Sequence, residues 1–188
     1  MTQDTSSQRS RNRRLLIAIF VLFFGSFLVA GLLRFSGWRP PALKNKGELM
    51  QPYGDLRAVQ PRLADGAAYA WNPQARLWRI VVAPPPACGE ECIRLSRELD
   101  TVWRLFGRNA DQVHVLWIGP PPQGALRNSA TRVLRDDPAL RAGLARSQDP
   151  RGVPVYVVDP NGFVILRYAP GFDPGDLRTD VARLLKLR

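Results

Sequence analysis

The chain has 188 residues, which is enough for one domain or for one domain with a membrane anchor. Its 27 lysines and arginines outnumber 16 aspartates and glutamates, for a formal net charge of +11. Eight basic residues and one acidic residue fall within the first 46 positions, beside an apolar segment, where they can meet anionic lipid headgroups. The remaining arginines are scattered without interleaved aromatic residues, which argues against a nucleic-acid partner.

An uncharged apolar run extends from Leu15 to Leu33. As a helix it would span roughly 28 Å, close to the thickness of about 30 Å of a hydrocarbon core. The apolar region of a cleaved signal peptide is shorter, roughly 7–15 residues, and Leu28-Val29-Ala30 is a poor cleavage site. We therefore predict an uncleaved transmembrane helix over residues 15–33.

The positive-inside rule does not set the orientation of this helix, because basic residues flank it on both sides. Export of residues 1–14 would carry four arginines across the membrane, whereas a large following domain can be translocated largely regardless of its charge. We predict a cytoplasmic tail over residues 1–14, a single pass through a bacterial inner membrane and a C-terminal domain in the periplasm.

Residues 34–60 read as a linker and an irregular lead-in, and residues 61–188 as one domain. Buried strands are expected from hydrophobic runs, and helices from apolar residues at helical spacing. The expected strands are Leu77–Ala83, Val113–Ile118, Val153–Val158 and Phe163–Tyr168, with a short additional strand at Tyr69–Trp71. The expected helices follow Pro86, cover Ala125–Arg146 with a break near Pro138, and run from Pro174 to Leu187.

The first two long strands are separated by one helix, which predicts a right-handed crossover and a parallel pair. Asp159-Pro160-Asn161-Gly162 predicts a tight hairpin between the last two strands. The order β-α-β-α-β-β-α is that of a thioredoxin-like fold, an α/β class with a central mixed sheet flanked by helices.

The two cysteines of the chain, Cys88 and Cys92, stand between a buried strand and a helix. Their spacing puts both thiols on one face if the helix begins near Cys88. Neighbouring thiols can form a disulfide or bind a soft metal such as Cu(I). A helix N-terminus lowers the pKa of a thiol, and the carboxylates of Glu90 and Glu91 would oppose that effect. A purely structural disulfide, or two unrelated buried cysteines, are the alternative interpretations.

Hydrolytic chemistry finds no support in the sequence, which has one histidine, no G-x-S-x-G motif, no P-loop and no cluster of histidines and carboxylates.

The anchor, the strand that leads into the two cysteines, and the segment from Val155 to Gly162 together resemble the thioredoxin superfamily. Within it, the chain looks especially like the Sco/SenC proteins, membrane-anchored factors that help to deliver copper during cytochrome c oxidase assembly. The resemblance covers most of residues 45–188. It implies an oxidase subunit or another assembly factor as partner.

The chain departs from the Sco pattern in two places. Sco proteins use a histidine just before the hairpin strand as a third copper ligand, and here that region, Asp149–Pro154, has none. His114 lies at the start of the second long strand, where a packed histidine is expected. Met50 is a remote candidate donor. Arg151-Gly152-Val153-Pro154 instead resembles the thioredoxin loop whose proline is cis and faces the cysteines, which predicts a cis bond before Pro154.

Three functions remain open at this point. A thiol-disulfide oxidoreductase would use Cys88 as the attacking thiolate and Cys92 as the resolving one, without a cofactor. A copper carrier would use the same two sulfurs as metal ligands. A non-catalytic assembly scaffold would need neither chemistry. The missing histidine favours the redox factor, which would keep the copper-site cysteines of an oxidase subunit reduced.

Overall fold

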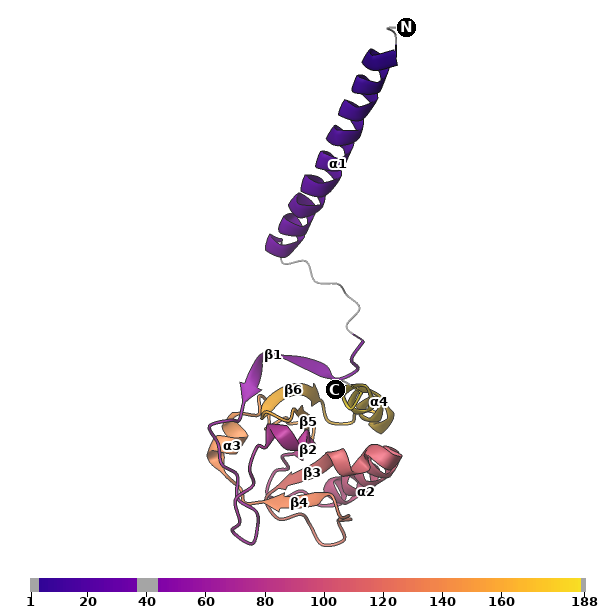
Figure 1. Ribbon diagram of the computed structural model, residues 1–188. Helices are drawn as coiled ribbons and strands as arrows, with labels where there is room; N and C mark the ends of the chain where they lie inside the picture. The colour runs from indigo at the N-terminus through magenta and orange to yellow at the C-terminus, as the bar shows by residue number, and fades with distance from the viewer. Residues whose placement is uncertain (1–3, 37–43, 187–188) are drawn as a thin grey trace. The chain divides into compact units, whose positions relative to one another are not determined.

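The computed structural model describes residues 4–36 and 44–186, and the chain divides into two units whose boundary in the sequence follows Lys44 (Figure 1). The first unit contains helix α1, Asp4–Phe35. Among the described residues, its segment Arg11–Phe35 is the one helix long and apolar enough to cross a membrane, and its side chains are not buried within the protein. The predicted span of residues 15–33 lies inside this helix.

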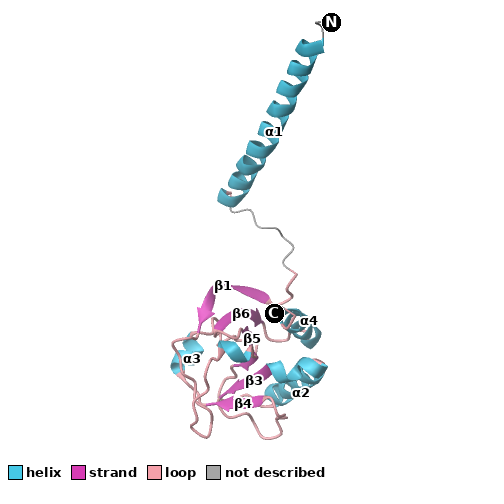
Figure 2. Cartoon of the chain, in the orientation of Figure 1, coloured by secondary structure: helices cyan, strands magenta, loops and turns pink. Residues whose placement is uncertain are grey.

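The second unit is built on one six-stranded sheet (Figure 2). The strands are β1 Glu48–Asp55, β2 Trp78–Val82, β3 Val113–Ile118, β4 Thr131–Leu134, β5 Val155–Val158 and β6 Phe163–Tyr168, in the spatial order β1-β6-β5-β2-β3-β4. Strands β2, β3 and β4 run parallel, whereas β5, β6 and β1 are joined by antiparallel pairs. This mixed sheet confirms the predicted thioredoxin-like fold.

Helices cover both faces of the sheet. Helices α2, Glu90–Arg104, and α4, Pro174–Leu184, contact each other and share one face, while the short helix α3, Pro138–Ala142, lies over the other (Figure 1). Two 3-10 helices, Pro73–Ala75 and Gly107–Gln112, precede β2 and β3. Each face carries its own hydrophobic cluster, and both clusters lie wholly within the second unit. This unit therefore contains the core it needs to fold.

Helix α2 is amphipathic, because its apolar residues recur every three or four positions. Its buried side chains include Cys92, Leu95, Leu99 and Val102, while its arginines face solvent. The helix connects β2 to β3, which pair in parallel from Trp78 with Val113 to Val82 with Trp117. The predicted crossover is thus confirmed, and it places the start of α2 just beyond the carboxyl end of β2.

The sequence predicts an irregular lead-in up to residue 60, and the structure instead places β1 there, at the edge of the sheet. Glu48 pairs with Arg167 and Asp55 with Phe163, and the register shifts between Leu49 and Gly54. The proline at position 52, typical of edge strands, obscured this strand in the sequence. The domain therefore begins near residue 45 rather than 61.

The prediction of a helix over Ala125–Arg146 is mostly wrong. Residues 131–134 form β4, and only Pro138–Ala142 is helical. Competing side-chain bonds explain the difference, because Asn128 binds its own loop and the carboxylate of Asp100. Residues 69–71 form no strand; the Tyr69 hydroxyl and the Trp71 ring instead pack beside Arg79.

A buried carboxylate fastens the start of the domain to its last helix. Asp180 of α4 is 2% exposed and accepts the backbone N–H groups of Lys46 at 2.6 Å and Gly47 at 2.9 Å. It also accepts the hydroxyl of Tyr168 at 2.8 Å. Burial, together with this bond, raises the pKa of the Tyr168 phenol well above its ordinary value.

We expect Asp180→Ala to lower the free energy of unfolding of a fragment of residues 45–188 by about 3 kcal/mol, because three donors lose a charged acceptor in a buried place. Urea unfolding followed by circular dichroism measures this difference. Asp176→Ala is the control, because Asp176 is partly exposed and its 3.9 Å ion pair with Lys46 should contribute less than about 1 kcal/mol. Equal losses in the two variants would contradict the role of Asp180.

Candidate redox site

The cysteines occupy the turn between β2 and α2. The N–H of Cys88 donates to the carbonyl of Pro85 at 3.3 Å, and Gly89 is the N-cap of α2. Cys88 therefore precedes the helix that the sequence predicts to begin near it, and Cys92 lies in the first turn. The run of three prolines before this turn ends β2, because proline cannot donate to a strand ladder.

Cys88 and Cys92 form a disulfide, with their Cα atoms 5.6 Å apart. Cys88 is partly exposed, whereas Cys92 is 0% exposed and belongs to the core cluster beneath α2. An external thiol or disulfide can therefore reach the pair through Cys88. The roles of Cys88 as the attacking thiol and Cys92 as the resolving one stay a prediction.

The segment between the cysteines contacts the loop before β5. The N–H of Val153 donates to Oε1 of Glu91 at 2.9 Å. Gly152 adopts a φ of 137°, and a Cβ atom at this position would collide with the Glu91 carboxylate. The backbone conformation favours glycine here, and a larger residue would displace the Glu91 carboxylate. The sequence analysis did not predict this contact of Glu91 with the loop. The position of a carboxylate between the two cysteines was the one feature of the sequence that could have indicated it.

This loop is itself anchored by a buried ion pair. Asp149 accepts the guanidinium of Arg167 at 2.7 Å and that of Arg151 at 2.9 Å. Arg167 is 2% exposed, and its second terminal nitrogen, Nη1, lies 3.6 Å from the Glu48 carboxylate of β1. Hydrogen bonds from Arg151 and Arg167 hold the pKa of Asp149 well below its usual range, so Asp149 stays ionised and the loop stays fixed to β6.

The prediction of a cis peptide bond before Pro154 is wrong. Among the described residues the one cis bond precedes Pro52, and the Val153–Pro154 bond is not cis. The resemblance of Arg151–Pro154 to the thioredoxin loop thus does not extend to the isomer of its proline. The loop itself lies beside the cysteine segment. The N–H of Val153, the residue before Pro154, donates to Glu91, one of the three residues between the cysteines.

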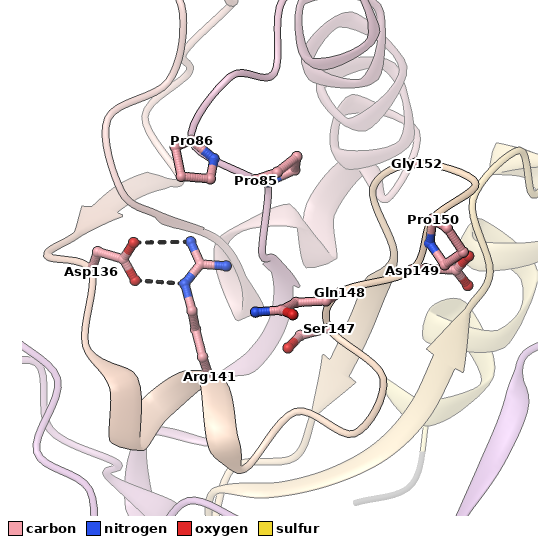
Figure 3. Close-up of a pocket in the computed structure, with 9 residues that line it drawn as sticks. All are labelled: Pro85, Pro86, Asp136, Arg141, Ser147, Gln148, Asp149, Pro150 and Gly152. Atoms are coloured by element: carbon pink, nitrogen blue, oxygen red, sulfur yellow. Dashed lines mark hydrogen bonds and ion pairs between the residues drawn. The ribbon is translucent and has the colours of Figure 1, made fainter.

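A cavity of about 450 Å³ lies between the turn that leads to Cys88 and the loop before β5 (Figure 3). Its charged groups largely neutralise one another: Arg141 binds both carboxylate oxygens of Asp136 and the carbonyl of Pro84. The cavity is lined by Pro85, Pro86, Asp136, Arg141, Ser147, Gln148, Asp149, Pro150 and Gly152.

His114 lies away from the cysteines, as expected. It pairs with Arg79 near the amino end of β2, whereas Cys88 follows the carboxyl end of that strand. Its Nδ1 lies 2.9 Å from the hydroxyl of Tyr69. Burial lowers the pKa of His114 to about 4, with contributions from Arg132 and Arg79. His114 is therefore a packed, neutral side chain near pH 7.

No third metal donor accompanies the two sulfurs in the part of the chain that the structure describes. No group of three or more histidine, cysteine or acidic side chains there is arranged to hold a metal ion. Met50 is 7% exposed and packs in the cluster on the opposite face of the sheet from the one that contains Cys92. Two thiolates alone suit Cu(I), which is a soft ion. They are one ligand fewer than the two cysteines and one histidine of the Sco pattern.

The family model described as "Transmembrane-like, thioredoxin-like, C-terminal domain" matches residues 78–188, more than half of the chain. The chain belongs to this family. The match begins with β2 and includes the cysteine pair, the Val153 loop and α4. A comparison with curated protein sequences finds no match.

Solved structures share the fold of this thioredoxin-like domain. BsSco, a member of the Sco family of cytochrome c oxidase assembly proteins with a disulfide switch, has a TM-score of 0.54 and 11% identity, covering 76% of this chain and 98% of BsSco. Copper-bound ScoI of Arabidopsis thaliana has a TM-score of 0.50 and 15% identity, covering 69% and 96%. Apo Trgpx has a TM-score of 0.52 and 14% identity, covering 70% and 95%. At these identities the likeness confirms the predicted Sco-like fold.

We expect iodoacetamide to alkylate Cys88 at least about tenfold faster than Cys92 after reduction of the folded protein, because reactivity follows exposure and Cys92 is fully buried. Peptide mass spectrometry of timed samples measures both rates, and the same reaction in urea is the control that should equalise them. Similar rates in the folded protein would show that Cys92 is as accessible as Cys88.

Proposed function

We propose that the chain is a membrane-anchored thiol-disulfide oxidoreductase of the bacterial periplasm that assists assembly of the copper site of cytochrome c oxidase. The observation that carries this proposal is the disulfide between a reachable Cys88 and a buried Cys92 at the start of α2 in a thioredoxin-like domain. Two neighbouring sulfurs of unequal exposure suit an exchange reaction in which one attacks and the other resolves.

The reaction starts from the reduced chain and an oxidised partner. The Cys88 thiolate attacks one sulfur of a partner disulfide, and the other partner sulfur leaves as a thiolate. The Cys92 thiolate then attacks the sulfur of Cys88 in the mixed disulfide and releases the second partner thiolate. The partner gains two electrons and the chain ends with the Cys88–Cys92 disulfide. A dithiol donor on the same side of the membrane must reduce this disulfide before another turnover.

The partner that we propose is an oxidase subunit whose copper site contains cysteines. Support comes from the shared fold with BsSco, which belongs to a family of oxidase assembly proteins. Support also comes from α1, because an anchored domain would remain beside membrane-embedded oxidase subunits. Copper binds such a site only through deprotonated, reduced sulfur, so a reductant of the cysteines is a plain requirement of assembly.

A copper carrier is the second candidate, and the adjacency of the two sulfurs favours it. Reduced Cys88 and Cys92 could hold Cu(I) as cargo, and the fold is shared with a Sco protein crystallised with copper. The described residues offer no imidazole near these sulfurs, since His114 lies at the other end of β2. Cu(II), which prefers nitrogen and oxygen ligands, should therefore bind poorly.

We expect the full chain with Cys92→Ser to form a stable mixed disulfide with a peptide that carries the two copper-site cysteines of an oxidase subunit, supplied as its own disulfide. The Cys88 thiolate can attack, and no resolving thiol remains. Non-reducing electrophoresis and mass spectrometry detect the adduct. Cys88→Ser is the matched control, and it should form little adduct because Cys92 is buried.

Copper titration of the same proteins separates the two candidates. Absence of an adduct with Cys92→Ser, combined with tight binding of Cu(II) at one site in the unmodified chain, would replace the redox function with the carrier function. An adduct together with weak Cu(II) binding would support the redox function.

The periplasmic location has a test of its own. We expect a reporter that is active only in the cytoplasm to be silent when it is fused after Arg188, because the arginine-rich tail should stay inside and the domain should be exported. A reporter that is active only after export is the control and should be active at the same position. Activity of the cytoplasmic reporter would reverse the orientation.

A further inference from the structure

The steps of the exchange reaction described above do not involve the hydrogen bond between the Glu91 carboxylate and the Val153 N–H. We propose that Glu91 is a positioning residue for this reaction: its carboxylate ties the segment between the two cysteines to the loop before β5, and so holds the sulfurs of Cys88 and Cys92 together when the disulfide is open. The proposal rests on the redox function proposed above.

Apart from the disulfide, the backbone hydrogen bonds that hold this segment are local. Cys88 and Gly89 precede the helix, and Gly89 offers no side chain to cap the first turn. The backbone bonds from Cys88 to Pro85 and from Ile93 to Gly89 are both local, at 3.3 and 3.2 Å. The Glu91 bond differs from these because it spans 62 positions and connects the cysteine segment to another part of the domain.

The far end of this bond is a fixed point. Val153 is 2% exposed and stands two residues before β5, and the buried pair of Asp149 with Arg167 holds the same loop to β6. Removal of the Glu91 carboxylate would leave the Val153 N–H without its acceptor, which is unfavourable for a donor in so little exposed a residue. Two firmly held partners make the bond a restraint on the position of α2 relative to the loop.

The charge of Glu91 is a separate property that a test must distinguish from the bond. Arg94 and Glu98 line a cavity of about 210 Å³ together with Glu91 and Val153, so charged neighbours of both signs surround the carboxylate. Glu91→Ala removes both the bond and the charge. Glu91→Gln keeps an acceptor oxygen without the charge, and Glu90→Ala removes an equal charge from the exposed neighbouring residue.

Glutathione disulfide probes the position of the sulfurs without any partner protein. The Cys88 thiolate attacks it and releases one glutathione thiolate, then the Cys92 thiolate attacks the sulfur of Cys88 and releases a second. The chain loses two electrons and the glutathione disulfide gains them. The second step is intramolecular, so the equilibrium constant for forming the Cys88–Cys92 disulfide rises with the time that the two sulfurs spend within reach.

The experiment equilibrates the full chain in detergent with glutathione buffers of graded composition and counts free thiols by alkylation and mass spectrometry. We expect Glu91→Ala to lower the equilibrium constant for disulfide formation about tenfold, which corresponds to about 30 mV for this two-electron couple. Glu91→Gln and Glu90→Ala should each stay within about twofold of the unmodified chain. Circular dichroism confirms that all three variants are folded.

Two results would overturn the positioning role. One is an equilibrium constant for Glu91→Ala equal to that of the unmodified chain. The other is a loss in Glu91→Gln as large as in Glu91→Ala, which would assign the effect to the charge. Failure of the redox function would give another result: the disulfide of the unmodified chain would stay closed in every buffer. That result would contradict both proposals.

Discussion

The parallel pairing of β2 with β3 is the constraint on which the site depends. Parallel neighbours need a crossover, and here the crossover is α2, whose first residue lies eight positions beyond the end of β2. Both cysteines fall in or beside the turn that makes this connection, with Cys88 before the helix and Cys92 in its first turn. The amphipathic face of α2 then sets their unequal exposure, because the side of the helix that covers the sheet carries Cys92 into the core.

The second half of the site comes from the opposite side of the same topology. Strand β5 pairs antiparallel with β2, so the loop that enters β5 lies at the edge of the sheet where β2 ends. Two acidic residues bind across this edge. Asp149 of the loop pairs with Arg167 of β6, and Glu91 of the cysteine segment accepts the N–H of Val153 in the loop. A cavity lies between this loop and Pro85 and Pro86 of the turn that leads to Cys88 (Figure 3). Sulfur exchange is the chemistry that we propose for this set of residues.

The sequence was informative wherever burial left a regular pattern. The continuous apolar runs predicted β3 and β6 with the bounds that the structure has, and the strand-turn-helix setting located the cysteine pair. The patterns failed where side chains compete with the backbone or where long-range contacts decide. Pro52 obscured the edge strand β1, and the side-chain bonds of Asn128 precede β4 where a helix was expected. The break expected near Pro138 coincides with the start of the short helix α3, which the Asp137 side chain caps. The bond from Val153 to Glu91 joins residues 62 positions apart, which periodicity cannot detect.

The proposed function requires Cys88 and Cys92 to be an exchanging pair rather than a structural disulfide. The most direct measurement is the reduction potential of the whole chain, obtained by titration against thiol buffers with both cysteines followed by alkylation. We expect the two thiols to appear together in one two-electron transition, at a potential between about −300 and −120 mV, the range of thiol pairs that exchange. A disulfide that stays closed well below about −300 mV would be structural and would contradict the redox function.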